Sequence, residues 1–379
     1  MKVFIASEFR CNIYKGEYYL LPKAYFIYQR YADAFGKVIF CSRFKKVDKL
    51  SGGMMKAEFI DDVISINSLA AVILHRYDSL IKDRIIDCDL TIIRCPSIIA
   101  YAAGRVAKKN NKKVLAESMC DGWEPYWYHG LTGKIIAPYM HFNMKKYVKN
   151  ADYAIYVTEH YLQNRYPCLN KNINASNVMI EELDEDVLNR RINKIEHMSK
   201  NNIKIMTTAD VDVISKGHRF VISAMKELKE NQINITYYLA GAGDQSVILK
   251  QAKKLGVDDS IVFLGRLSME DVFKYLDLID IYVHPSLQEG LPRAVIEAMS
   301  RACPCIGANT AGIPELLDKS CVFNKASSKA IVNSIKTILN SDMKKIALNN
   351  FTHCSNYLND EICKKRNKYF EYIKKDLNK

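Results

Sequence analysis

Short apolar runs rich in Val, Ile and Tyr alternate with amphipathic stretches along almost the whole chain. In the first half the runs include Lys2–Ala6, Leu90–Arg94 and Lys113–Ala116, while Pro22–Phe35 and Ser68–Ile86 are amphipathic. Strict alternation of strands with helices predicts parallel sheets that are covered by helices on both faces. The pattern therefore predicts the α/β class with doubly wound sheets.

The second half repeats this pattern. Strands are expected at Ile203–Thr207, Ile235–Ala240 and Asp280–Val283, and helices at Gly217–Glu230 and Met269–Ile279. The helix at Met269 follows a serine and has an acid in its first turn, which is typical of a capping box. The second half of the chain is therefore predicted to form a second doubly wound sheet.

The alternation pauses around residues 178–201, where a polar stretch shows no clean periodicity. At 379 residues the chain is long for one domain and comfortable for two. We therefore predict Rossmann-like domains over residues 1–180 and 181–355, with a helix over 356–379 that packs back toward the first domain. Because open α/β sheets bind ligands at the carboxyl ends of their strands, we expect a cleft between the domains.

Composition narrows the class of protein. Hydrophobic residues make up 49% and charged residues 26%, which is the balance of a globular protein. No run of eighteen apolar residues is present, so we expect no membrane span. The first residues lack the pattern of a signal peptide, and the 11 cysteines are scattered, which is typical of reduced cytoplasmic thiols. No cluster has metal-ligand spacing, so we expect neither a metal nor another cofactor.

Charge is distributed unevenly along the chain. Residues 1–150 carry 24 Lys and Arg against 14 Asp and Glu, whereas residues 151–379 carry 31 against 28. A basic first half favours an anionic partner, such as nucleic acid, a membrane surface or a phosphate-bearing substrate. No nucleic-acid motif accompanies the charge, so we expect no nucleic-acid partner. A solvated lysine-rich surface is the alternative.

The most informative segment reads HPSLQEGLPRAVIEAM from position 284. A strand is expected to end at Val283 and a helix to open near Leu291, so Glu289 precedes the helix and Glu297 lies about two turns inside it. A helix start offers free N–H groups to an anion. The two backbones lie roughly 12 Å apart at helical rise, beyond the separation of about 5–9 Å that a glycosidase pair needs. The two acids are better placed to hold separate parts of one elongated ligand, although surface acids at a helix start remain the alternative.

Small or charged residues follow the other predicted strands of this half. Lys216 opens a helix after the first strand, and a lysine there can reach a diphosphate. Gly241 and Gly243 follow the next strand, where glycine permits close approach of a ligand to the backbone. Arg266 follows the third. Each feature alone is also typical of a plain turn.

The stretch Asp280–Leu317 resembles the signature region of retaining glycosyltransferases of family 4, the glycosyl transferases group 1, which have the GT-B fold. The E-x7-E pair of this family matches Glu289 and Glu297. The resemblance is strong over residues 203–340 and only architectural over the first half. It implies two Rossmann-like domains facing across a cleft, the first on the acceptor side and the second binding a nucleotide-sugar donor. It also implies metal-independent transfer with retention at the anomeric carbon.

The resemblance assigns roles to single residues. Glu289 would contact the donor sugar near the reacting carbon, Glu297 the ribose hydroxyls, and Lys216 the diphosphate. The backbone N–H groups of Gly290 and Leu291 would bind donor oxygens, and Arg266 would lie beside the base. Gly241 and Gly243 complete the expected donor site.

One departure concerns the diphosphate. The family usually has an arginine several residues before the lysine, where this chain has Thr207–Asp210 followed by Val211. Arg219 or a residue of the first domain is the expected substitute. The absence of this cation leaves open a non-catalytic, nucleotide-binding relative.

The first domain offers fewer signals. Relatives often place a histidine or acid after the strand that corresponds to Lys113–Ala116, so Asp121 is the predicted catalytic residue and Glu117 the second candidate. A loop acid without such a role is an equal alternative. Gly16 is predicted to lie in a loop over the diphosphate, or in a plain turn.

An aromatic loop and a basic helix complete the first domain. Trp123 and Trp127 lie in a loop that can stack on an acceptor sugar, rest at a membrane interface or pack into the core. Lys145, Lys146 and Lys149 share a predicted helix with aromatic residues, which fits contact with anionic lipid at the inner face of the membrane or a solvated face. The predicted acceptor is a glycan, or a glycan on a lipid diphosphate, in bacterial surface polysaccharide synthesis. A nucleotide-sugar epimerase of the same architecture is the alternative.

Overall fold

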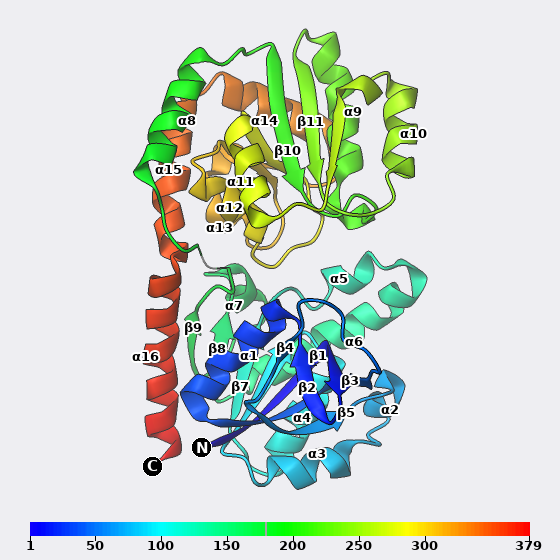
Figure 1. Cartoon of the computed structure of the whole chain (residues 1–379), viewed down its shortest axis with the longest axis vertical. Coiled ribbons are helices and arrows are strands. Elements are labelled where there is room, and N and C mark those ends of the chain that lie inside the picture. Colours follow the sequence, from blue (N-terminus) through cyan, green and yellow to red (C-terminus); the bar gives the residue numbers. More distant parts are fainter. Residues whose placement is uncertain (179) are drawn as a thin grey trace. The chain divides into compact units, whose positions relative to one another are not determined.

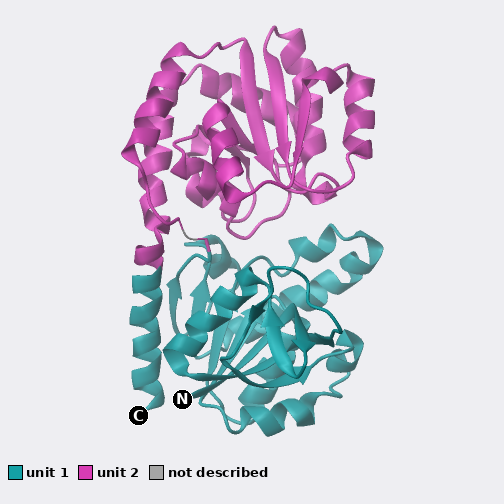
Figure 2. Ribbon diagram, in the orientation of Figure 1, with its two compact units in different colours: residues 1–177, 363–379 teal, residues 178–362 magenta. Residues whose placement is uncertain are grey.

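The structure is a computed structural model that describes residues 1–178 and 180–379. Its chain forms two compact units, residues 1–177 with 363–379 (unit 1) and residues 178–362 (unit 2) (Figure 2). Both units consist of a sheet with helices packed against it (Figure 1). The predicted α/β class with doubly wound sheets is confirmed.

Unit 1 is built on a mixed sheet in which most neighbouring strands are parallel. β1 lies at its centre, pairing with β3 on one side and β6 on the other, and the order continues through β7 and β8 to β9. The strands are β1 (Lys2–Tyr14), β2 (Glu17–Leu20), β3 (Lys37–Lys46), β4 (Met55–Lys56), β5 (Ile60–Ser65), β6 (Leu90–Cys95), β7 (Val114–Ser118), β8 (Tyr153–Tyr156) and β9 (Lys171–Asn174). The helices that begin in this unit are α1 (Pro22–Phe35), α2 (Leu69–Ile73), α3 (Asp78–Ile85), α4 (Ile98–Lys109), α5 (Glu124–Trp127), α6 (Gly130–Lys149) and α7 (Tyr161–Arg165).

Two elements of unit 1 differ from their sequence-based prediction. β1 continues past Ala6 through a register shift and turns back into β2, making an antiparallel hairpin. The stretch Ser68–Ile86 is not one helix, because the chain turns between α2 and α3, where His75 has a φ of 64°. A non-glycine residue in this region of φ cannot continue a right-handed helix.

The last helix, α16 (Asn359–Leu377), contributes to the core of unit 1. Tyr369, Phe370 and Ile373 are buried among residues of α1, β1 and β3. Arg366 on the same helix is also buried and reaches Glu117 on β7 at 3.5 Å. The end of the chain is therefore fixed to unit 1 by both apolar and ionic contacts.

Unit 2 has a fully parallel sheet in the order β12-β11-β10-β13-β14-β15. Its strands are β10 (Asn202–Thr208), β11 (Asn234–Ala240), β12 (Ile261–Gly265), β13 (Ile281–His284), β14 (Cys305–Ala308) and β15 (Val322–Phe323). Its helices are α8 (Glu185–His197), α9 (His218–Glu230), α10 (Ser246–Leu255), α11 (Met269–Leu278), α12 (Arg293–Ser300), α13 (Ile313–Leu316), α14 (Ser328–Leu339) and α15 (Met343–Cys354). The strand order reverses direction between β10 and β13, and this switch point is where such sheets bind ligands.

Strands β13 and β14 of unit 2 are buried along their whole length, as expected for the interior of a parallel sheet, whereas the edge strand β12 is half-buried. The predicted cap of α11 is present, since the Ser268 hydroxyl accepts the N–H of Asp271 at 3.1 Å. No helix in the described part of the chain combines the length and the hydrophobicity that crossing a bilayer requires.

Candidate functional site

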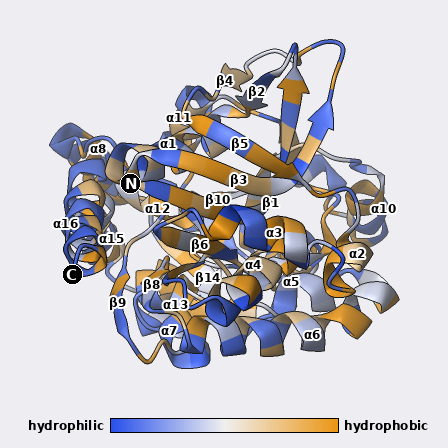
Figure 3. Ribbon diagram, turned by 90° about the horizontal axis from the view of Figure 1, so that it is seen from below, coloured by the Kyte–Doolittle hydropathy of each residue, from blue (hydrophilic) through white to orange (hydrophobic). Residues whose placement is uncertain are grey.

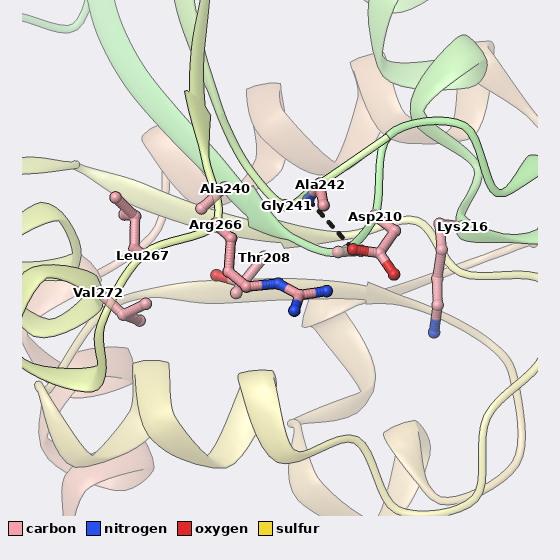
Figure 4. Close-up of a pocket in the computed structure, with 10 residues that line it drawn as sticks. Thr208, Asp210, Lys216, Ala240, Gly241, Ala242, Arg266, Leu267 and Val272 are labelled. Atoms are coloured by element: carbon pink, nitrogen blue, oxygen red, sulfur yellow. Dashed lines mark hydrogen bonds between the residues drawn. The ribbon is translucent and has the colours of Figure 1, made fainter. Parts of the chain in front are cut away.

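An open pocket of about 330 Å³ lies at the carboxyl ends of β10, β11 and β12. It is lined by loop residues and by the last residues of these strands: Thr208, Ala209, Asp210, Lys216, Ala240, Gly241, Ala242, Arg266, Leu267 and Val272 (Figure 4). Three of the predicted site residues, Lys216, Gly241 and Arg266, therefore share one cavity. Its position next to the switch point is where a doubly wound sheet holds a ligand.

The pocket contains two cations and one acid. Arg266 extends across it from the end of β12, and Lys216 and Asp210 enter from the loop after β10 (Figure 4). Asp210 is anchored, because one of its carboxylate oxygens accepts the N–H of Ala242 at 3.1 Å. Asp210 lies within the segment where the family usually has its arginine, and it places a negative charge beside Lys216. The second candidate cation, Arg219, is not part of the lining; it is exposed and stacks over Phe220 at 4.7 Å.

The loops that flank the switch point are joined through Glu289. The Lys216 ammonium lies 2.8 Å from its Oε1, and Nε2 of His284 lies 3.0 Å from the same oxygen. His284 is the last residue of β13 and is almost fully buried, whereas the Lys216 side chain is 28% exposed. Because Lys216 also lines the pocket, it can interact with a ligand without moving far from Glu289.

The two neighbours keep Glu289 ionised. Burial would raise the pKa of this carboxyl, but hydrogen bonding and charge from His284, with the charge of Lys216, outweigh it and lower the pKa to about 2. Glu289 therefore carries a full negative charge at neutral pH. A carboxylate in such a position accepts hydrogen bonds from hydroxyl groups and stabilises a nearby developing positive charge.

Backbone contacts hold the two loops together. The N–H of Leu287 donates to the carbonyl of Ser215 at 2.7 Å. Gly217 has a φ of 76°, and a Cβ at this position would lie 2.1 Å from the carbonyl oxygen of Pro285. Only glycine fits here, so the loop carrying Lys216 can lie directly against the loop carrying Glu289.

The predicted glycines Gly241 and Gly243 also lie where two loops pack closely against each other. A Cβ on Gly241 would lie 2.0 Å from the carbonyl oxygen of Ala209, and one on Gly243 would lie 2.4 Å from Oδ1 of Asp212. These glycines let the loops after β10 and β11 pack against each other. Gly241 lines the pocket and Gly243 is not among the lining residues.

Glu297 is buried on α12, with Arg293 of the preceding turn 3.9 Å away. The helix begins at Arg293, and Pro292 in the N-cap position makes no side-chain cap. The first N–H groups of α12 are therefore left without a side-chain acceptor at the cap, next to Gly290 and Leu291. The contacts of Gly290 and Leu291 to donor oxygens stay a prediction.

The predicted acid of unit 1 lies in a different environment. The Asp121 carboxylate is fully buried; it pairs with Arg165 and accepts hydrogen bonds from the hydroxyls of Tyr161 and Tyr166. It also accepts the N–H of Trp123 at 2.6 Å. These contacts give Asp121 a structural role in ordering its loop, and its catalytic role stays a prediction.

The other two candidates of unit 1 are also accounted for by local structure. Glu117 is completely buried among Arg94, Arg30 and Arg366. Gly16 has a φ of 82° and follows Lys15, with a φ of 50°, in the two-residue turn between β1 and β2. Two successive residues with positive φ are typical of a type I′ hairpin turn, which explains the glycine without a ligand.

Sequence reasoning missed His284. His284 is the first residue of the informative segment. A histidine at the end of a strand is more often a core residue, so its position alone did not indicate a role. The contact of its ring with Glu289 becomes visible only in the fold. Among the described residues, no group of three or more His, Cys, Asp or Glu side chains is arranged to hold a metal ion.

Comparison with known proteins identifies the family. The family described as glycosyl transferases group 1 matches residues 189–352. Protein CapJ of Staphylococcus aureus is 31% identical over 395 residues, covering 100% of this chain and 97% of that protein. The chain belongs to the group 1 glycosyltransferases. Over a shorter stretch, 27% of each chain, this glycosyltransferase is 34% identical to the amylovoran biosynthesis glycosyltransferase AmsK of Erwinia amylovora.

Solved structures identify the fold. Sucrose-phosphate synthase from Thermosynechococcus elongatus superposes with a TM-score of 0.66 at 14% identity, covering 98% of both chains. HepE of Anabaena, solved in complex with UDP, gives a TM-score of 0.65 at 15% identity, covering 98% of this glycosyltransferase and 100% of HepE. The predicted GT-B fold is thereby confirmed.

Proposed function

We propose that this glycosyltransferase transfers a sugar, with retention at the anomeric carbon, from a nucleotide-sugar donor bound in unit 2 to a glycan or lipid-linked glycan acceptor. The observation that carries the proposal is the shared position of Lys216, which lines the pocket and lies 2.8 Å from Glu289 at the switch point. A cation in this position serves a diphosphate on one side and a carboxylate on the other.

In the proposed reaction the bond between the anomeric carbon and the diphosphate breaks while the acceptor oxygen attacks from the same face. The proton of the acceptor hydroxyl passes to an oxygen of the departing diphosphate, so charge and protons balance without an external base. Lys216 and the first N–H groups of α12 stabilise the charge that develops on the diphosphate.

Glu289 has a different part in this scheme. Its carboxylate is ionised and held by His284, so it can accept hydrogen bonds from the donor sugar hydroxyls. It also favours the positive charge that develops at the anomeric carbon. His284 positions this carboxylate and does not touch the reacting atoms.

The remaining donor contacts are proposed from the resemblance to the family, and of the two residues concerned Arg266 lines the pocket and Glu297 does not. Glu297, buried on α12, is proposed to bind the ribose hydroxyls, and Arg266 to lie beside the base. A nucleotide-sugar donor is supported by HepE, which was solved with UDP and with UDP-glucose. An acceptor in surface polysaccharide synthesis is supported by the relative AmsK, named for amylovoran biosynthesis.

Product analysis tests the proposal. The purified chain is incubated with single nucleotide sugars and a lipid-diphosphate-linked glycan, and the product is examined by mass spectrometry and by NMR of the new anomeric centre. We expect one donor to be consumed only when acceptor is present, with its anomeric configuration kept. Inversion would contradict retention, conversion of donor without acceptor would indicate an epimerase, and absence of any turnover would favour a non-catalytic relative.

A further inference from the structure

Helix α6 in unit 1 has two faces of different character. Its buried face consists of Gly133, Ala137, Met140, Met144, Tyr147 and Val148, which recur every three or four residues. Its opposite face is exposed and carries apolar side chains in the first turns of the helix. Figure 3 shows hydrophobic stretches along α6 next to hydrophilic ones.

The exposed face is unusually apolar for an outer surface. Leu131 and Ile135 are 81% and 79% exposed, the highest values among the large apolar side chains of the described residues, and Phe142 is 65% exposed. Positions 131, 135 and 142 are separated by four and seven residues, so they form one stripe along the helix. Isolated exposed apolar residues need no explanation, but an aligned stripe marks a binding surface.

Aromatic residues extend this stripe toward α5. Trp127 is 39% exposed and Tyr128 is 36% exposed, directly before α6 begins. The ammonium of Lys134 lies over the Trp127 ring at 5.3 Å. Indole and phenol rings with an adjacent cation are the side chains that settle at the boundary between lipid headgroups and acyl chains.

The charge on α6 is of one sign. The sequence of residues 130–149 contains four lysines and no aspartate or glutamate. Three of them, Lys145, Lys146 and Lys149, are exposed and follow the apolar stripe in the last turns of the helix. A protein surface would need to be strongly acidic to match this face, whereas a bilayer with anionic headgroups matches both its apolar and its cationic parts.

We propose that the exposed face of α6, with Trp127 and Tyr128, binds the surface of a membrane that contains anionic lipids. The stripe of Leu131, Ile135 and Phe142 enters the headgroup region, and the lysines contact lipid phosphates. This binding would bring a lipid-linked acceptor and the enzyme to the same surface. The proposal goes beyond the transfer reaction, and its test involves no nucleotide, so the two can fail separately.

Vesicle binding tests this proposal. The full chain is mixed with vesicles of phosphatidylcholine alone or with 30% phosphatidylglycerol, and binding is followed by flotation. Trp123 and Trp127 are the only tryptophans of the chain, so a blue shift of intrinsic fluorescence reports directly on this segment. We expect binding and a blue shift with the anionic vesicles only, weakened by 0.5 M salt.

Two variants separate the contributions. Lys145→Glu/Lys149→Glu is expected to weaken binding to anionic vesicles by at least about 10-fold, and Leu131→Ser/Ile135→Ser to abolish the blue shift. The matched control, Val247→Ser/Lys253→Glu on α10 of unit 2, removes a side chain that is 73% exposed together with one lysine and should bind as the wild type does. Circular dichroism and the thermal midpoint verify folding.

Three results would overturn the proposal. Wild-type chain that does not float with anionic vesicles, or that binds neutral vesicles equally well, has no charge-dependent membrane surface. Variants on α6 that bind like the control place the contact elsewhere. Self-association of the wild type that the Leu131→Ser/Ile135→Ser variant dissolves would assign the stripe to a second copy of the chain.

Discussion

Each unit contains a glutamate that is held ionised by neighbouring cations, and the two environments differ in one respect. Glu117 in unit 1 is completely buried, and two of its three partners, Arg94 and Arg366, are buried as well. Glu289 in unit 2 is 13% exposed, and its partner Lys216 is 28% exposed at the edge of the pocket. The cluster around Glu117 offers a ligand almost no charged surface, since Arg94 lines a pocket of unit 1 with only 1% of its side chain exposed. The cluster around Glu289 has a cation that a ligand can reach.

The comparison separates structural from functional ion pairs. The arginines that surround Glu117 also donate to other groups of unit 1: Arg366 to the carbonyl of Ala175 at 2.7 Å, Arg94 to the hydroxyl of Tyr28 at 3.1 Å and Arg30 to Oδ1 of Asn177 at 2.6 Å. Such a cluster stabilises one arrangement of α16 and β7, and its buried arginines present almost no exposed charge to a substrate. A perturbed carboxyl is therefore a sign of function only where at least one partner presents exposed charge to a cavity.

The largest effect on stability should come from removing the negative charge of Glu117 from its cluster of arginines. Replacing Glu117 with Gln leaves buried arginines without their countercharge and should lower the free energy of unfolding by about 3–5 kcal/mol, as measured by urea denaturation. The cations lower the pKa of Glu117 well below its ordinary value of 4.5. Its contribution is therefore present above pH 4.5 in the wild type and is lost as the pH falls below that value.

A control for this variant lies on α16. Glu371→Gln removes the partner of Lys374 at a position whose side chain is 59% exposed, and the expected change is below about 1 kcal/mol. If Glu117→Gln cost no more than this control, the cluster would not hold α16 in place.

A substitution in the ion pair of Lys216 and Glu289 should change the activity strongly and the stability only slightly. Lys216→Ala should reduce turnover at saturating donor by about 10²–10³-fold, because it removes stabilisation of the leaving diphosphate. Its stability should change by less than about 1 kcal/mol, since the pair is partly solvated. Lys274→Ala, which removes an exposed ion pair with Glu270 on α11, is the control for both quantities. Unchanged turnover in Lys216→Ala would remove its proposed role.

Glu297 should affect donor binding. Glu297→Ala deletes the proposed acceptor of the ribose hydroxyls and should raise the Kd of the nucleotide sugar by about 10–100-fold, as measured by titration calorimetry. Donor affinity equal to that of the wild type would contradict the ribose assignment. Glu270→Ala on the surface of α11 should bind the donor as the wild type does.

The smallest expected effect is a change in the affinity of the pocket for its ligand. Asp210→Asn keeps an oxygen for the N–H of Ala242 and removes a negative charge from the pocket. Affinity for a nucleoside diphosphate should rise by about fivefold, the equivalent of roughly 1 kcal/mol of screened repulsion, and the gain should shrink in high salt. A weaker complex would show that Asp210 itself holds the donor.

The elements that sequence reasoning predicted in unit 2 lie within a residue or two of their actual bounds, but α8 was missed, because it lies in the polar stretch 178–201 that shows no clean periodicity. Met269–Ile279, for example, corresponds to α11 at Met269–Leu278. Regular alternation and a capping serine are local signals, so they can be read from one sequence. The division of Ser68–Ile86 into two helices could not be read, because it depends on the left-handed conformation of His75.

The sequence indicated which residues belong to the candidate site, but it did not indicate which of them contact one another. Lys216 and Glu289 are 73 residues apart, and their ion pair depends on how two loops pack through Gly217 and Pro285. The same applies to Asp121, whose buried network with Arg165 and two tyrosines gives no sign in the sequence. Gly241 shows the same limit of a single sequence, because it lines the pocket as predicted and also permits the packing of two loops, which the sequence did not indicate.

The most direct test of the donor site is hydrogen–deuterium exchange of the wild-type chain with and without a panel of nucleoside diphosphate sugars. One donor should protect the loops at residues 208–217, 240–244 and 284–297, because their N–H groups become hydrogen-bonded or shielded in the complex. Protection confined to unit 1, or no protection by any donor, would contradict the assignment of the donor to the pocket of unit 2.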